Sequence, residues 1–90
     1  VDKVFLGISG ISVERGMTTG TMVEAEVKKA IINCGKEVIG LADSTKFHID
    51  AFVSVAPVTA LDTLVTDDKI TSDVKGALEE LGVEVIEAKV

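Results

Sequence analysis

The sequence predicts an α/β domain with a mostly parallel sheet, in which right-handed β-α-β crossovers connect the strands. Strand-like and helix-like segments alternate along the chain, and such alternation implies parallel strands. The 90 residues are 47% hydrophobic but only 3% aromatic, and the apolar ones are mainly Val, Ile, Leu and Ala. That composition is typical of strands buried on both faces. Each helical segment also starts at a capping residue and stops at a glycine.

The first half of the chain reads as strand, loop, helix and strand. Residues 1–8 form the first strand, and residues 9–20 form a loop punctuated by glycines. Thr21 and Glu24 make a capping box at the start of a helix that Gly35 ends. Residues 36–42 are a second strand. The helix carries an apolar stripe that we expect to face the core: Val23, Val27, Ala30, Ile31 and Cys34. On its solvent side we expect an ion pair between Glu24 and Lys28.

The second half repeats the alternation after a short irregular link. The link holds an extended segment at residues 51–55 and a helical turn at 58–61, and residues 62–66 are the next strand. Ser72 caps a second helix, Gly82 ends it, and residues 83–88 form an edge strand. Two helices are too few to cover four strands on both faces. We therefore expect these residues to be a fragment of a longer chain, or to oligomerise.

Charge and cysteine content exclude several classes of function. Fifteen acidic residues against nine basic ones give a net charge of −6, which argues against direct binding of nucleic acid or an anionic membrane. No apolar run approaches the roughly 20 residues of a bilayer span. The single cysteine rules out an internal disulfide and fits the cytoplasm. His48 has no partner at ligand spacing, so we expect a surface residue and no metal site.

The most suggestive polar segment is Asp43-Ser44-Thr45-Lys46, directly after the second strand. Ligands of open α/β sheets bind outside the carboxyl ends of the strands. The ammonium of Lys46 would supply the point charge that a phosphate or carboxylate requires. The alternative is a helix-entry turn in which Asp43 is a cap and Lys46 is solvated. Spacing alone does not decide between the two.

Two further segments have a functional and a structural interpretation. Residues 16–20 carry hydroxyls and amides before a helix start, where a phosphate can bind. A capping turn is the interpretation that this pattern favours, since neither a Walker nor a Rossmann spacing is present. Residues 66–69 could hold a metal or a sugar hydroxyl, but a turn with capping acids is the favoured interpretation.

The order of these segments resembles the effector domain of DeoR-family transcriptional repressors. The resemblance covers nearly the whole chain and rests on residues 5–11, 16–19, 24–30, 41–47, 55–57 and 62–67. It implies a sensor with a sugar-phosphate isomerase/CoA-transferase-like fold, similar to ribose-5-phosphate isomerase and glucosamine-6-phosphate deaminase. Such a sensor binds a phosphorylated sugar, which alters the hold of an N-terminal winged helix-turn-helix on DNA. Residues 1–90 would be the C-terminal part of that sensor, without the DNA-binding module and the phosphate loop of the first stretch. A cytoplasmic homo-oligomer without a cofactor is implied.

The resemblance also assigns roles to individual residues. The isomerases carry an Asp-x-Ser-Lys-like segment whose Lys contacts the substrate, and Asp43, Ser44 and Lys46 match it. Glu26 is the nearest match to their general base, with an offset in spacing. Where they carry acidic residues after the first strand, this chain has serines in residues 9–12, which are poor acid–base groups. We therefore expect a sensor with no catalytic residue. The expected ligand contacts are Lys46, Asp43, Ser44, Thr18, Thr19, Gly16, Glu26 and Asp67.

Two alternatives to a sensor stay open. The chain could be a fragment of a sugar-phosphate isomerase or deaminase, which turnover by the full-length protein would reveal. It could also be an oligomerisation module whose polar residues are only caps, in which case no sugar phosphate would stabilise it.

Overall fold

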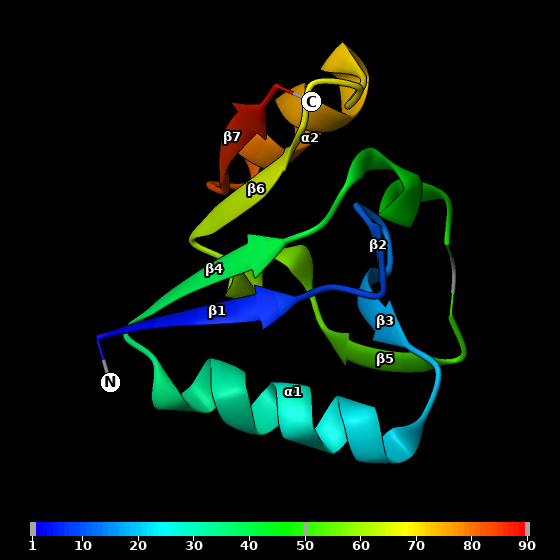
Figure 1. Ribbon diagram of the computed structural model, residues 1–90, viewed down its shortest axis with the longest axis vertical. Helices are drawn as coiled ribbons and strands as arrows, with labels where there is room; N and C mark the ends of the chain where they lie inside the picture. Colours follow the sequence, from blue (N-terminus) through cyan, green and yellow to red (C-terminus); the bar gives the residue numbers. More distant parts are fainter. Residues whose placement is uncertain (1, 50, 90) are drawn as a thin grey trace.

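The main sheet confirms the predicted α/β class. The computed structural model describes residues 2–49 and 51–89. Within these residues the main sheet has four strands, all parallel, in the order β1-β4-β6-β7 (Figure 1). Their bounds are β1 Lys3–Gly7, β4 Glu37–Leu41, β6 Thr63–Asp67 and β7 Glu84–Ala88. As predicted, the last strand lies at an edge of the sheet.

A second, antiparallel sheet replaces part of the predicted loop over residues 9–20, so that prediction was wrong. Its strands are β2 Gly10–Ser12, β3 Gly16–Thr19 and β5 Val53–Ala56, with β3 in the middle. All four residues of β3 are buried. Gly16 has a φ of +81°, which glycine adopts without the strain that a side chain would cause. Strands this short show no clear alternation of apolar residues, and their glycines are typical of a loop.

The helices begin close to where the sequence predicts. α1 spans Met22–Cys34, and the Thr21 hydroxyl accepts a hydrogen bond from the Glu24 amide at 3.1 Å. α2 spans Ser72–Glu80, but Thr71 rather than Ser72 is its cap, accepting from the Val74 amide at 3.3 Å. Short 3-10 helices, η1 Ser44–His48 and η2 Val58–Ala60, flank β5. None of the helices in the described residues is long and apolar enough to cross a membrane.

The two helix-ending glycines act for different reasons. Gly82 has a φ of +91° and provides the predicted left-handed residue after α2. Gly35 has a φ of −101°, so the prediction of a left-handed residue there was wrong. A Cβ at Gly35 would lie 2.7 Å from Val4 Cγ2. Gly35 is therefore needed for close approach to β1 rather than for its backbone conformation.

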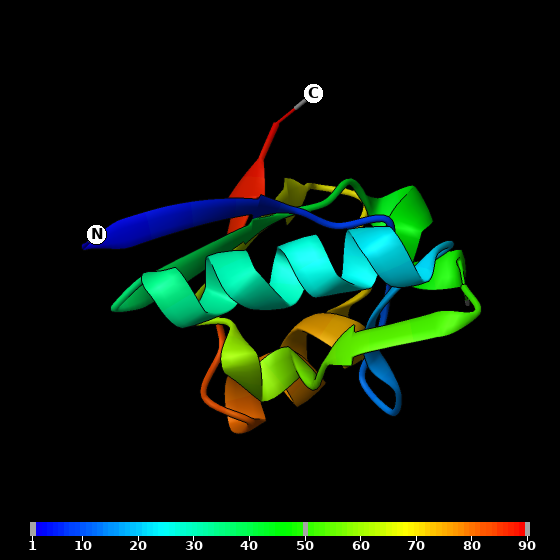
Figure 2. The same ribbon diagram turned by 90° about the horizontal axis from the view of Figure 1, so that it is seen from below.

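The connecting elements cover one face of the main sheet. Figure 2 shows α1, α2 and β5 on the same side of β1 and β4. Alternate strand residues on this side are buried, among them Leu6, Val38 and Leu64. Lys75 on α2 donates to Glu87 on β7 at 2.6 Å. Right-handed crossovers that always step in one direction along a sheet place their connections on one face, which explains the layering.

The apolar stripe of α1 exists, but its predicted direction was wrong. Val23 and Val27 are 74% and 54% exposed, and Ala30 and Cys34 are also exposed. The residue of α1 that is fully buried is Ala25, which lies on a different face of the helix. Helical periodicity identifies a stripe, but it does not say which neighbouring element covers it.

Candidate functional site

The candidate site lies at the edge of the main sheet where the parallel strands end. η1 leaves the carboxyl end of β4, and Asp43 is its N-cap. Asp43 Oδ1 accepts hydrogen bonds from the Thr45 amide at 3.0 Å and from the Thr45 hydroxyl. The Thr45 hydroxyl, opposed in part by desolvation, holds the pKa of Asp43 below its ordinary value. The helix-entry turn is therefore real, and Asp43 is its cap.

Asp67 fixes η1 to the end of β6. Its Oδ2 accepts from the Ser44 amide at 2.9 Å and from the Ser44 hydroxyl at 3.1 Å. Its Oδ1 accepts from the Lys69 amide at 2.9 Å. The Ser44 amide is the largest of the interactions that lower the pKa of Asp67. Asp67 thus holds Ser44 in place, a positioning role that spacing did not suggest, while its predicted contact with ligand stays a prediction.

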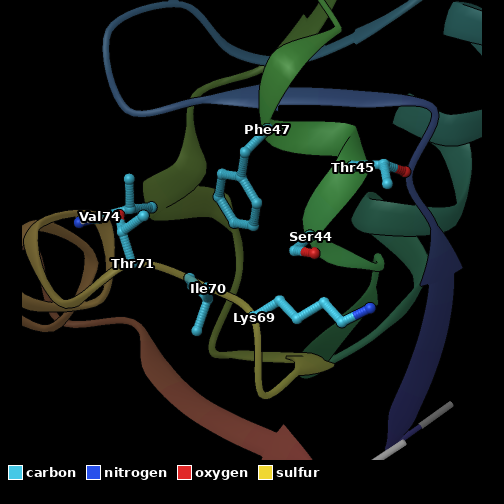
Figure 3. A pocket seen from close by; sticks show the side chains of 7 residues that line it. All are labelled: Ser44, Thr45, Phe47, Lys69, Ile70, Thr71 and Val74. Carbon is cyan, nitrogen blue, oxygen red and sulfur yellow. Dashed lines mark hydrogen bonds between the residues drawn. The ribbon is translucent and has the colours of Figure 1, made fainter.

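A pocket of about 330 Å³ opens between η1 and the start of α2. One wall is apolar and consists of Phe47, Ile70 and Val74. The remaining lining residues carry hydroxyls or an ammonium: Ser44, Thr45, Lys69 and Thr71. In Figure 3 the Phe47 ring points into the pocket between Ser44 and Val74, and the Lys69 ammonium extends past Ser44. This volume lies at the lower end of the range for small-molecule sites.

Lysines approach the same edge from three elements. Lys46 lies on η1 and is half-buried, and Lys69 follows β6. Lys28 on α1 donates to Ser9, after β1, at 3.0 Å. Sequence reasoning missed Lys28 because helical spacing predicted a pair with Glu24. Glu24 instead accepts from the Thr19 hydroxyl at 2.7 Å. The signal that could have found Lys28 was the polar Ser9 at a strand end.

Of the eight predicted contact residues, Ser44 lines this pocket. Asp43, Lys46 and Asp67 lie on or against η1 without lining the pocket. The other four lie elsewhere. Gly16, Thr18 and Thr19 belong to the buried strand β3. The Thr18 hydroxyl accepts from the Ala51 amide at 3.1 Å. Glu26 is exposed on α1, with its carboxylate 4.0 Å from Lys29 Nζ. Their predicted role in ligand binding stays a prediction, and the structure gives the two threonines a role in packing.

The structure bears only in part on the predictions about metals and about His48. Among residues 2–49 and 51–89, no group of three or more His, Cys, Asp or Glu side chains is placed to hold a metal ion. The backbone of His48 ends η1, and its side chain lies outside the described part of the structure.

An open parallel sheet with hydroxyls, carboxylates and lysines at the carboxyl ends of its strands is the architecture of an α/β ligand-binding domain. A family model described as the DeoR C-terminal sensor domain matches residues 1–68. The chain belongs to this family, as the sequence resemblance predicted.

Similar proteins point to the same family. The HTH-type transcriptional regulator GlpR of Haloferax volcanii is 31% identical over 86 residues, covering 96% of this chain and 34% of that protein. The HTH-type transcriptional repressor GlcR of Bacillus subtilis is 35% identical, covering 96% of this chain and 33% of that protein. A putative aga operon transcriptional repressor of Escherichia coli O157:H7 is 31% identical, covering 94% and 32%. The chain spans about a third of the length of the curated relatives it matches.

Proposed function

We propose that this chain supplies the η1 side of an effector site that binds a phosphorylated sugar, and that the bound sugar controls DNA binding by another part of the full-length protein. The observation that carries the proposal is the ordered turn after β4. Asp43 and Asp67 hold the backbone of Ser44 and Thr45, and Lys46 follows on the same turn.

The chemistry of this edge suits a ligand with one anionic group and several hydroxyls. Lys46 and Lys69 would attract the phosphate as point charges. Ser44 and Thr45 line the adjoining pocket and would exchange hydrogen bonds with sugar hydroxyls. Asp43 remains exposed and can accept a hydrogen bond from a further hydroxyl. The apolar wall of Phe47, Ile70 and Val74 would pack against the carbon skeleton.

The site is proposed to sense rather than to catalyse. Interconversion of sugar phosphates needs an acid and a base positioned at adjacent carbons. After β1 the chain has Ser9 and Ser12, and the Ser9 hydroxyl already accepts from Lys28. The relatives are named as transcriptional regulators, which supports regulation over turnover.

The link to DNA is proposed to be indirect. This chain has a net charge of −6, so it lacks the excess of Lys and Arg that would neutralise the phosphates of DNA. A ligand that binds two conformations of the full-length protein with different affinity shifts their equilibrium, and DNA affinity changes by the same coupling.

The proposal is tested by thermal unfolding of the full-length protein with a panel of sugar phosphates, the matching free sugars and inorganic phosphate. At a free concentration of about 100 times its Kd, a ligand stabilises the folded state by about 2.7 kcal/mol. That is enough to raise Tm measurably. We expect at least one sugar phosphate to raise Tm while its free sugar does not. No shift with any compound would contradict the proposal, and aldose–ketose turnover would contradict the sensing role.

A further inference from the structure

One face of the main sheet carries large exposed apolar side chains. Phe5, Leu41 and Ile86 are 63%, 43% and 45% exposed, and they lie on β1, β4 and β7. Register places Phe5 beside Ile39 and Ile86 beside Val65, so these residues share the side opposite to the buried Leu6 and Leu64. No element of the described residues covers this side, which faces the viewer in Figure 1.

The same surface continues around the outer edge of β1 onto α1. A groove of about 370 Å³ runs between them. Its apolar lining comes from Phe5, Leu6, Val23, Val27 and Ile31, and Glu24 and Lys28 also line it. β1 is hydrogen-bonded to β4 on one side, and its other edge is unpaired within residues 2–49 and 51–89. An unpaired strand edge beside apolar side chains is a surface that proteins normally cover.

We propose that another segment of the same polypeptide docks on this surface, adding a strand to the free edge of β1 and packing apolar side chains on Phe5 and on Val23 and Val27. The length of the relatives supports an occupant from the same polypeptide. Each relative is about three times as long as its segment that matches this chain. The stripe of α1 has the pattern of a buried helix face, yet apart from the half-buried Ile31 its residues are exposed. A second copy is disfavoured, because two chains of net charge −6 would repel each other.

Thiol labelling of the full-length protein tests this docking. In a background with the native cysteines, including Cys34, replaced by Ser, the positions to label are Phe5→Cys and Val27→Cys. The matched control is Asn33→Cys, an exposed position on a different side of α1. We expect native-state labelling of the two groove positions to be at least about tenfold slower than the control, since only local opening exposes them. All three should label equally fast in denaturant.

Two outcomes would overturn the proposal. Equal labelling of groove and control positions in the native protein would mean that the surface is open. Protection that disappears on dilution would mean that a second copy covers it. Hydrogen exchange of unmodified full-length protein gives a readout independent of the substitutions. A paired edge protects every amide of residues 3–7, whereas fast exchange of those facing away from β4 would contradict the added strand.

Discussion

Two segments rich in small and hydroxyl-bearing residues, Gly16–Thr19 and Ser44–Lys46, look alike in the sequence but have different roles in the structure. The first is the buried central strand of the second sheet, and its hydroxyls bond to Ala51 and Glu24. The second is a surface turn whose backbone is held by two carboxylates. The difference teaches that hydroxyl-rich composition does not define a ligand site. What matters is whether the hydroxyls already form hydrogen bonds with other parts of the protein.

The largest effect is expected from Gly16→Ala in the buried segment. A Cβ at this position would lie 2.3 Å from the Ala56 carbonyl oxygen, and the φ of +81° would strain any side chain. We expect a loss of about 3 kcal/mol in the free energy of unfolding. Denaturant unfolding of the full-length protein measures it. Gly20→Ala is the matched control, because nothing lies within 4 Å of its Cβ position. Equal losses at both positions would show that β3 is not packed as described.

A smaller effect is expected from Thr18→Val, which keeps the shape of a buried side chain. The Thr18 hydroxyl accepts from the Ala51 amide, so valine leaves that donor without its partner. We expect about 1–2 kcal/mol less stability. Calorimetry on the folded variant should find sugar-phosphate affinity within about twofold of the parent, a difference below roughly 0.5 kcal/mol. A large loss of affinity with unchanged stability would instead make Thr18 a ligand contact.

The surface turn should respond to pH through Asp67. Its pKa is lowered in the folded protein, so its contribution to stability is present above its ordinary pKa and is lost as pH falls through the folded value. The free energy of unfolding, measured between about pH 6 and pH 2.5, should therefore fall more steeply toward acid pH in the parent than in Asp67→Asn. Asp68→Asn, at an exposed neighbouring position, serves as the control. Identical pH profiles for the parent and Asp67→Asn would show that Asp67 does not hold η1.

Sequence patterns predicted most of the main sheet and the helix starts. The strands of the main sheet were short segments rich in apolar residues, and Thr21 with Glu24 marked the beginning of α1. The resemblance to the DeoR family brought Lys46, Ser44 and Asp43 together, and the structure places them on one turn. These features depend on local spacing or on order along the chain, which a sequence shows directly.

Other features could not be read from the sequence because they depend on distant partners. β3 pairs with β2 on one side and on the other with β5, which is more than thirty residues away, and Gly16 made the segment look like a loop. The direction of the α1 stripe depends on which elements pack beside it, and Val23 and Val27 remain open in this chain. The bond from Ser44 to Asp67 joins residues 23 positions apart, so spacing rules did not reveal the positioning role of Asp67.

Lys46→Ala should have the smallest effect on stability, within about 0.5 kcal/mol, because it removes a half-buried side chain from the surface turn. Its effect on binding tests the central proposal most directly. Calorimetry of the full-length protein would compare it with Lys36→Ala, an exposed lysine before β4, at the opposite end of that strand. We predict that Lys46→Ala weakens sugar-phosphate binding at least about tenfold, or about 1.4 kcal/mol, while Lys36→Ala leaves it unchanged. Unchanged affinity in Lys46→Ala, or equal losses in both variants, would contradict the assignment of the effector site to this turn.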